Sequence, residues 1–242
     1  MEGGKYIDRV FLNREIDPKS YLYRLPAVRH LSGGKALQFL RDVTFFVGEN
    51  GAGKSTILEA IAIAYGFNAE GGTKNFNFST NATHSELWEH LTISRSRYAK
   101  DGFFLRAESF YNVATNIDAL GVDGSYGRAS LHTKSHGESF MALVQNRFGG
   151  NGLYILDEPE AALSPTRLMT LLAEIHDLVQ RGSQFIIATH SPILMAYPGA
   201  CIYEFSEDGI CPVEYTQTEH YQVTRRFLEN PEQMLRYLLE KN

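Results

Sequence analysis

The sequence contains little cysteine. Its 242 residues include two cysteines, Cys201 and Cys211, which lie ten residues apart and outside any metal-ligand pattern. The disulfide framework of a small secreted domain is therefore excluded, and we interpret the pair as free thiols of a cytosolic protein. The two could be brought together only if they lie on neighbouring strands.

The sequence also lacks long apolar runs and a recognisable leader. No run approaches the ~20 residues that a membrane-spanning helix needs. The first five residues, MEGGK, contain neither a basic region nor an apolar segment. We therefore expect a cytoplasmic protein with no transmembrane segment of its own. Neither positive nor negative charge is in large excess. The formal net charge of −5 disfavours broad, non-specific binding of nucleic acid but is compatible with a local basic patch.

The composition that remains is that of an ordinary globular protein. Hydrophobic residues make up 43% of the chain and charged residues 21%. A chain of this length can bury a large core, as one extended domain or as two tightly joined ones.

One stretch is highly specific. Residues 48–55, GENGAGKS, match the pattern G-x-x-x-x-G-K-S. They follow an apolar run at 43–47 that predicts a buried parallel strand. They open the segment 56–65, whose apolar residues recur at helical spacing until Gly66. Strand, glycine loop and helix together are the context of a phosphate-binding loop. A chance match in a glycine-bearing loop has odds of about one in a hundred for a chain this long.

The residue types of this loop are those that phosphate binding requires. Glycines let backbone N–H groups turn inward around phosphate oxygens, and the helix N-terminus adds partial positive charge. Lys54 is predicted to reach the β- and γ-phosphates, and the Ser55 hydroxyl to ligate Mg²⁺. The other predicted nucleotide contacts are Asn50, Gly51, Ala52, Gly53 and Thr56.

A second apolar run, at 153–156, ends in Asp157 and Glu158. Acids at the carboxyl end of such a strand lie where open α/β sheets bind ligands. Asp157 is predicted to hold Mg²⁺ directly or through water, and Glu158 to orient and deprotonate a water molecule. The alternative is an ordinary pair of solvated acids at a strand end. The phosphate loop upstream favours the functional interpretation.

A helix is predicted to begin after Ser164, and a third buried strand, at 185–189, follows it. A helix between two strands makes a βαβ unit, so the strands are expected to be parallel. His190 then lies at the same sheet edge as Lys54 and Glu158. The nearness of Lys54 and Glu158 favours a role of His190 at the γ-phosphate over a purely structural one.

The segment 135–139, SHGES, opens a further predicted helix that ends at Gly149. A helix N-terminus with Ser and Gly is an anion site. An ordinary Ser N-cap with a Glu nearby is the alternative.

The remaining segments are assigned from short apolar runs and turn residues. Residues 1–47 suit strands and turns better than helices, and the runs between 66 and 121 suit antiparallel hairpin strands beside the nucleotide core. Residues 119–134 are rich in Gly and Ser and are expected to be mobile until something docks on them. The C-terminal part predicts a hairpin about residues 208–209 and two short helices, the last with Asn230 as N-cap. The predicted buried stripe of this last helix consists of Met234, Leu235 and Leu238.

In this order the motifs resemble the head of ABC-type ATPases. They correspond to a Walker A motif at 48–55, a signature-like motif at 135–139, a Walker B motif at 153–158 and a switch histidine at 190. From signature to Walker B aspartate (135 to 157) there are 22 residues, and from there to the histidine (157 to 190) there are 33, both close to the family's spacing. The resemblance extends from about residue 5 to residue 205.

Departures from the transporter pattern point to the soluble branch of this family, which includes SMC, recombination-repair and stand-alone predicted ATPases. The signature reads S-H-G-E instead of S-G-G-Q, and residues 163–165 read L-S-P where transporters typically carry an aspartate. The segment 31–35, LSGGK, resembles the transporter signature but precedes the phosphate loop, and we interpret it as a turn. Only ~80 residues without heptads separate Walker A from the signature, so the long SMC coiled coil is not expected. A nuclease domain after His190 is not expected either.

The resemblance implies an α/β fold: a P-loop NTPase core with a mostly parallel sheet, an antiparallel β subdomain and a helical signature subdomain, in one ATPase domain over residues 1–242. The parts are expected at 1–66 and 151–205 for the core, 67–118 for antiparallel strands, 119–150 for the signature part and 206–242 for a C-terminal hairpin and helices.

The resemblance also implies an ATP-dependent homodimer. Walker A and B of one subunit would hold ATP and Mg²⁺, while Ser135 and Gly137 of the other cap the γ-phosphate. Glu158 would be the general base and His190 a γ-phosphate sensor. No glutamine occupies the Q-loop position, where Glu108 is the candidate that would contact Mg²⁺ or water. The aromatic residue that stacks on adenine is left open among Tyr6, Phe11, Tyr21 and Tyr23.

Three functions follow from these interpretations. The leading one is a soluble, ATP-hydrolysing dimerisation switch that acts on an unknown protein or nucleic-acid partner. The alternative is the nucleotide-binding subunit of a membrane ABC transporter, against which the divergent signature counts. A third is a binding module that uses ATP only to set its conformation, or the ATPase half of a defence or toxin system.

Overall fold

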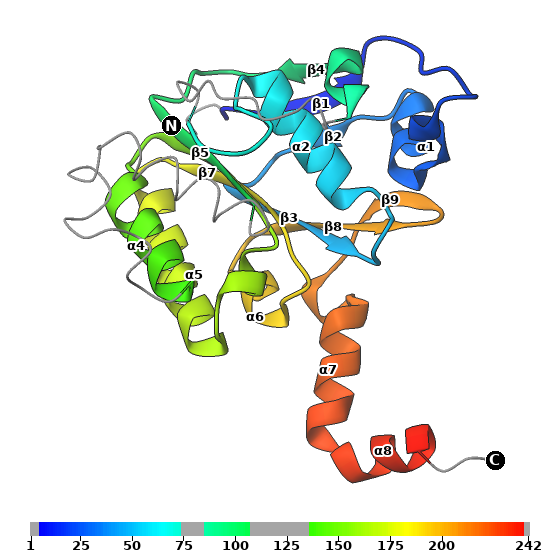
Figure 1. The fold of residues 1–242 in the computed structure, drawn as a ribbon, viewed down its shortest axis with the longest axis vertical. Helices are drawn as coiled ribbons and strands as arrows, with labels where there is room; N and C mark the ends of the chain where they lie inside the picture. Colours follow the sequence, from blue (N-terminus) through cyan, green and yellow to red (C-terminus); the bar gives the residue numbers. More distant parts are fainter. Residues whose placement is uncertain (1–4, 74–84, 107–135, 240–242) are drawn as a thin grey trace.

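The computed structural model describes residues 5–73, 85–106 and 136–239 (Figure 1). The larger of its two sheets has six strands in the order β5–β6–β7–β3–β8–β9, and each neighbouring pair is parallel except β8 with β9. The strands are β3 (Val43–Gly48), β5 (Asp101–Arg106), β6 (Gly152–Asp157), β7 (Gln184–Ala188), β8 (Cys201–Ser206) and β9 (Gly209–Pro212).

The smaller sheet is antiparallel, in the order β2–β1–β4. Its strands are β1 (Arg9–Leu12), β2 (Leu37–Gln38) and β4 (Leu91–Ser94). The α-helices are α1 (Pro26–Ser32), α2 (Lys54–Tyr65), α4 (His136–Arg147), α5 (Pro165–Gln180), α6 (Pro192–Met195), α7 (Glu219–Glu229) and α8 (Pro231–Leu239). Short 3-10 turns are η1 (Tyr21–Arg24), η2 (Glu86–His90), η5 (Pro159–Ala162) and η6 (Tyr215–Gln217). The predicted fold class is confirmed.

The central strands are buried on both faces, which explains their continuous apolar sequence. Every residue of β3, β6 and β7 is buried. Side chains alternate along β3: Phe45 joins the core beneath α4 and α5, and Phe46 joins the core beneath α1 and α2. Figure 1 shows these helix pairs on opposite sides of the sheet.

The first 47 residues contain a helix, so the prediction of strands and turns alone was wrong there. The helix α1 begins with Pro26 at its first position, where proline's missing N–H costs nothing. Ala27, Val28 and Leu31 recur at helical spacing and are buried. Proline is a common turn residue, but here it starts the helix. The segment 31–35 forms the end of this helix and the turn that follows it.

The strand β5 corrects a second prediction, that of antiparallel strands throughout 67–118. It pairs with β6 in parallel, while β4 is antiparallel to β1 as predicted. Four consecutive residues of β5, 102–105, are buried, which is the pattern of a strand covered on both faces. Residues 74–84 and 107–118 of this predicted region lie outside the described residues.

The C-terminal hairpin of β8 and β9 is confirmed, but it begins at Cys201 and belongs to the main sheet, where β8 lies parallel to β3. Helices α7 and α8 then form an arm that projects from the body (Figure 1). The predicted buried stripe of α8 was wrong, because Leu235 and Leu238 are 42% and 71% exposed and Met234 is only half-buried. The stripe is apolar, but the arm extends into solvent.

Two polar connections hold the sheets and α4 in place. The buried side chain of Gln184 accepts hydrogen bonds from the backbone N–H groups of Tyr6 and Ile7, at 2.9 and 3.0 Å, and so ties β7 to the segment before β1. A second connection fixes the end of α4. Asp101 accepts hydrogen bonds from Arg147 at 2.7 Å, from Gly149 N–H at 3.0 Å and from Tyr154 at 2.7 Å.

Both cysteines are free, as predicted, and Cys211 lies opposite Glu204 in the hairpin register. Within the described ranges, none of the helices has the length and apolar character needed to cross a bilayer.

Candidate active site

The loop between β3 and α2 depends on glycine. Gly48, Gly51 and Gly53 have φ values of 122°, 83° and 98°, which side chains disfavour. A Cβ atom at Gly48 would also lie 2.1 Å from the carbonyl oxygen of Phe205, and one at Gly53 would lie 3.2 Å from Ala27 Cβ. The loop therefore follows its path only with glycine, between β8 on one side and α1 on the other.

Lys54 is folded back into this loop. Its side chain is 4% exposed, and Nζ donates hydrogen bonds to the carbonyl oxygens of Gly48 at 2.7 Å and Glu49 at 2.8 Å. Burial lowers the pKa of Lys54, and the nearby carboxylates of Glu158 and Asp157 act in the opposite direction. A buried ammonium ringed by backbone groups at a helix N-terminus is suited to an anionic phosphate.

Ser55 and Asp157 come together from different motifs. Ser55 Oγ donates to Asp157 Oδ1 at 3.0 Å. A hydroxyl and a carboxylate within reach of one cation fit Mg²⁺, which takes few protein ligands and completes its shell with phosphate and water. Among the described residues, no group of three or more His, Cys, Asp or Glu could hold a metal ion.

Arg106, at the end of β5, was not predicted. It lies opposite Asp157 in the register, with its Nε 3.5 Å from Asp157 Oδ2, and its Nη1 donates to Glu59 Oε2 at 2.6 Å. It thus holds two carboxylates, one from β6 and one from α2. Its position after the buried run of β5 was a usable signal, because the same reasoning selected Asp157. Glu108 lies outside the described residues.

Glu158 has a backbone conformation that non-glycine residues rarely adopt, with φ at 49°. Its N–H donates to the carbonyl oxygen of Ala188 at 2.9 Å, so the turn is fixed against the end of β7. The carboxylate, 39% exposed, brings Oε1 to 3.5 Å from His190 Nε2. Backbone strain of this kind is typical of functional sites.

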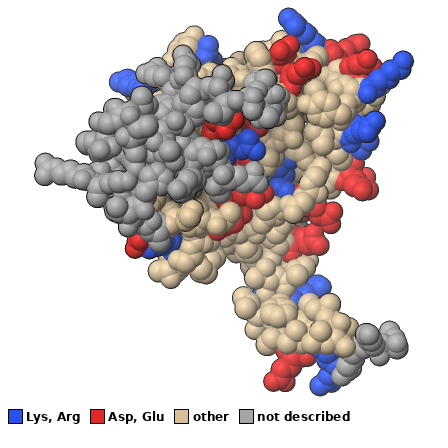
Figure 2. Space-filling model, viewed as in Figure 1, with Lys and Arg blue, Asp and Glu red and all other residues tan. Residues whose placement is uncertain are grey.

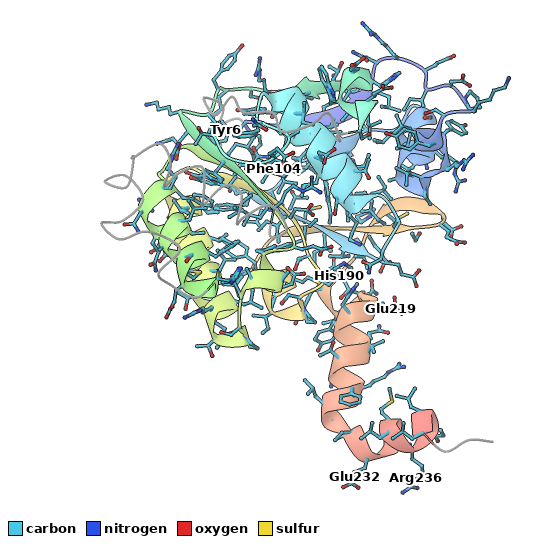
Figure 3. The ribbon with its side chains drawn as sticks, in the orientation of Figure 1. Tyr6, Phe104, His190, Glu219, Glu232 and Arg236 are labelled. Atoms are coloured by element: carbon cyan, nitrogen blue, oxygen red, sulfur yellow. The ribbon has the colours of Figure 1, made fainter. Side chains whose placement is uncertain are left out.

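His190 is held on three sides at the sheet edge. Its backbone N–H donates to the Glu160 carboxylate, its Nε2 faces Glu158, and its Nδ1 lies 2.8 Å from Nε2 of His220. Figure 3 places His190 beside Glu219, the first residue of α7. Burial lowers the pKa of His190, and the charge of Lys54 lowers it further. Burial raises the pKa of Glu160.

Gly137 lies in the first turn of α4, while Ser135 lies outside the described residues. A Cβ atom at Gly137 would lie 2.5 Å from Arg167 Nη1 and 2.9 Å from the carbonyl oxygen of Ala162. Within the chain, this glycine therefore allows α4 to approach η5 and α5 closely. The predicted contact with a partner's nucleotide stays a prediction.

A pocket of about 940 Å³ opens beside the phosphate loop. It is lined by Arg24 and Arg29 from the α1 region, by the loop at 48–52 and by the β8–β9 turn at 204–208. None of the four predicted adenine-stacking aromatics lines it. Tyr6 is buried, with its hydroxyl bonded to a backbone carbonyl. Among the described residues that Figure 2 draws, basic and acidic side chains are interspersed, without a large patch of one sign.

Two family models match the chain. Residues 27–110 match the model described as "AAA domain", and residues 133–196 match the model described as "AAA domain, putative AbiEii toxin, Type IV TA system". The first match includes the phosphate loop, and the second includes Asp157, Glu158 and His190. Both parts of the site thus lie in stretches that match models of AAA domains.

Curated proteins are similar to this chain over part of its length. The cytochrome c biogenesis ATP-binding export protein CcmA of Aliivibrio fischeri is 29% identical over 160 residues, which cover 61% of this chain and 78% of that protein. The galactose/methyl galactoside import ATP-binding protein MglA of Escherichia coli is 28% identical over 189 residues, which cover 68% of this chain but only 36% of that protein.

Among solved structures, the chain is similar to cbiO1 of Clostridium perfringens, part of the ABC transporter complex cbiONQ. The TM-score is 0.52 at 16% identity, with 98% of this chain and 100% of that one covered. This likeness concerns the fold. The SMC head domain of Thermotoga maritima aligns with a TM-score of 0.47 at 18% identity, over 86% of this chain and 99% of that one.

The structure brings five predicted site residues to one edge of the main sheet: Lys54, Ser55, Asp157, Glu158 and His190. Their separate roles in binding and catalysis stay predictions. Sequence reasoning missed Arg106, Glu160, His220 and the two arginines of the pocket. His220 and Glu160 carried no local signal, since neither belongs to a recognisable pattern.

Proposed function

We propose that this domain binds Mg·ATP and hydrolyses it to ADP and phosphate, and that ATP joins two copies into a dimer. The observation that carries the proposal is the convergence at one sheet edge of a buried ammonium, a hydroxyl–carboxylate pair and a strained glutamate beside a histidine. Each of these groups matches one requirement of phosphoryl transfer to water: phosphate charge, a metal ion and a base.

The phosphate loop supplies the binding. Backbone N–H groups of residues 50–56 and the start of α2 surround the phosphates, and Lys54 exchanges its two carbonyl partners for phosphate oxygens. Ser55 and Asp157 would hold the Mg²⁺ ion, which would neutralise charge on the phosphates. Arg106 keeps the Asp157 carboxylate in its position at the end of β6.

Glu158 acts as the general base. Its carboxylate accepts a proton from a water molecule as the water oxygen forms a bond to the γ-phosphorus and the bond to the β-phosphate oxygen breaks. His190, neutral around pH 7 because burial lowers its pKa, donates a hydrogen bond from Nε2 to a γ-phosphate oxygen. The partly exposed side chains of Glu158 and His190, at 39% and 28%, leave this edge open to a second subunit.

The dimer follows from the resemblance to ABC-type heads. Ser135 and Gly137 of one copy would cap the nucleotide of the other, so the interface would be two-fold and ATP would form part of it. We further propose a cytoplasmic location and an unknown protein or nucleic-acid partner as the target of the switch.

The substitution Glu158→Gln tests the catalytic proposal. Its amide keeps the shape of the side chain but accepts no proton, so ATP affinity should be kept and turnover abolished. Calorimetry measures the ATP affinity, and a phosphate-release assay measures the turnover. The matched control is Glu174→Gln on α5, away from this edge, which should leave both unchanged. Wild-type turnover in Glu158→Gln would contradict the role of the base.

A second candidate is the nucleotide-binding subunit of a membrane transporter. Two of the similar proteins, an export and an import ATP-binding protein, favour it. Purification of the Glu158→Gln protein with ATP should distinguish the candidates, since co-purification of a protein with several membrane spans would favour the transporter subunit.

A further inference from the structure

Helix α7 places a second histidine against His190. His220 is the second residue of α7, 30 residues along the chain, and its Nε2 lies 2.8 Å from His190 Nδ1. The ring centroids are 4.9 Å apart and the planes are tilted by 55°. The start of α7 is itself fixed, because the fully buried Thr218 caps it, accepting from Tyr221 N–H at 3.4 Å.

A contact of this length between two imidazole nitrogens requires one donor and one acceptor. Burial lowers the pKa of both rings, so both are neutral around pH 7 and each carries a single N–H. Either His190 donates through Nδ1 and keeps a lone pair on Nε2, or His220 donates through Nε2 and His190 carries its proton on Nε2.

The surroundings of His190 decide between the two arrangements. Its Nε2 faces the carboxylate oxygen of Glu158 at 3.5 Å, and among the described residues it has no other hydrogen-bond partner. A lone pair directed at a carboxylate would be repelled, whereas an N–H there is attracted. The proton therefore belongs on His190 Nε2, and His190 Nδ1 must accept from His220. The Nδ1 atom of His220, buried and unpartnered among the described residues, then keeps its lone pair.

We infer that His220 is a positioning residue of the ATPase site: it donates its Nε2–H to Nδ1 of His190 and so holds His190 as the tautomer that presents an N–H beside Glu158. The inference rests on the proposed function in that this N–H is the one assigned to the γ-phosphate. It also makes the first turn of the C-terminal arm part of the site, since no residue of the core replaces the donor among those described.

Nitrogen NMR of histidine-labelled protein tests the assignment without any turnover. In the wild type, His190 should show a protonated Nε2 and an unprotonated Nδ1. In His220→Ala, Nδ1 of His190 loses its donor and only the Glu158 carboxylate still favours the proton on Nε2, so a population with the proton on Nδ1 should appear. His220→Gln, whose amide N–H can reach the same position, should restore the wild-type pattern. A wild-type His190 protonated on Nδ1, or an unchanged tautomer in His220→Ala, would overturn the inference.

Turnover gives the second readout, with ATP as the probe. We expect kcat of His220→Ala to fall about tenfold with KM within about twofold, and kcat of His220→Gln to stay within about threefold of wild type, the scale on which hydrogen-bond partners of functional histidines act. The control is His176→Ala, which removes an exposed histidine that contacts Tyr197 at 3.3 Å, and it should behave as wild type.

The two proposals fail separately. If the wild type does not hydrolyse ATP, or Glu158→Gln hydrolyses it normally, the proposed function is wrong and the NMR tautomer still decides the role of His220. If Glu158→Gln is inactive while His220→Ala keeps the wild-type kcat, the role of His220 is wrong and the ATPase assignment stands.

Discussion

Ser55 Oγ and Asp157 Oδ1 lie 3.0 Å apart, although 102 residues separate them in the chain. The contact joins the first turn of α2 to the last residue of β6, two elements whose ends meet at the same sheet edge. It places the phosphate loop and the acidic strand end in a single site, because a cation bound by one of these oxygens is within reach of the other.

Removal of Lys54 should weaken nucleotide binding. In Lys54→Ala, ATP affinity should fall about tenfold or more, because a charge-assisted contact worth about 1.5–3 kcal/mol is lost. Calorimetric titration with Mg·ATP measures it. Lys35→Ala, at an exposed lysine, is the matched control and should bind as the wild type does. Equal affinity in the two variants would contradict the assignment of Lys54.

The roles of Asp157 and Glu158 should separate by binding. Asp157→Asn removes a negative charge from the proposed Mg²⁺ site, so affinity for Mg·ATP should decrease by about tenfold, the scale of one charged hydrogen-bonded contact. Glu158→Gln should bind as tightly as the wild type. Titration at several Mg²⁺ concentrations measures this. The same loss of affinity in both variants would mean that the roles are wrongly divided.

Nucleotide should control the oligomeric state. Glu158→Gln with Mg·ATP should sediment as a dimer, and without nucleotide mostly as a monomer, because ATP bound at an interface favours association by mass action. Ser135→Arg should still bind ATP but remain monomeric, since a bulky side chain would enter the closed interface. Mixing Ser135→Arg with Lys54→Ala should restore partial activity from two inactive proteins. Normal hydrolysis by monomeric Ser135→Arg would exclude the signature role.

The histidine pair should make stability depend on pH. Burial lowers the pKa of both His190 and His220, while Glu158 and Glu219 partly oppose this and Lys54 adds to it. The unfolded chain therefore binds protons first as pH falls below about 6.5. The stabilising contribution is fully present above that pH and is lost as pH falls through the lowered values.

Thermal melting between about pH 7.5 and about pH 5 measures this effect. The wild-type melting temperature should fall on acidification, and the double variant His190→Gln/His220→Gln should show a flatter profile. Identical slopes for the two proteins would show that the pair does not contribute.

The hydrogen bonds around Asp101 should stabilise the fold without serving the site. Tyr154→Phe removes a buried hydroxyl that lies 2.7 Å from Asp101 Oδ2 and 2.6 Å from the carbonyl oxygen of Gly149. The free energy of unfolding should decrease by about 1–3 kcal/mol, measured by urea denaturation. Tyr98→Phe, at a 73% exposed tyrosine, is the control and should change it by less than about 0.5 kcal/mol. ATP affinity should be unchanged in both.

The sequence alone determined the elements that carry local signals. The strand–loop–helix at 43–65 and the buried strands β6 and β7 with their terminal acids and histidine were all predicted, because parallel strands covered on both faces are continuous apolar runs and glycine loops need particular residues. The start of α5 after Ser164 was predicted as well, because capping is a local hydrogen bond, here to Arg167 N–H.

Only the tertiary structure decided the rest. The sequence of a short apolar run such as β5 does not indicate which strand it will pair with, because its partner β6 lies far along the chain. The periodicity of α8 indicates which face of the helix is apolar, but it does not indicate whether another element covers that face. The contacts of Arg106 with Asp157 and of His220 with His190 join residues 51 (106 to 157) and 30 positions apart, and depend on how whole elements pack. No local pattern encodes such contacts, since packing free energy is set by the complete fold.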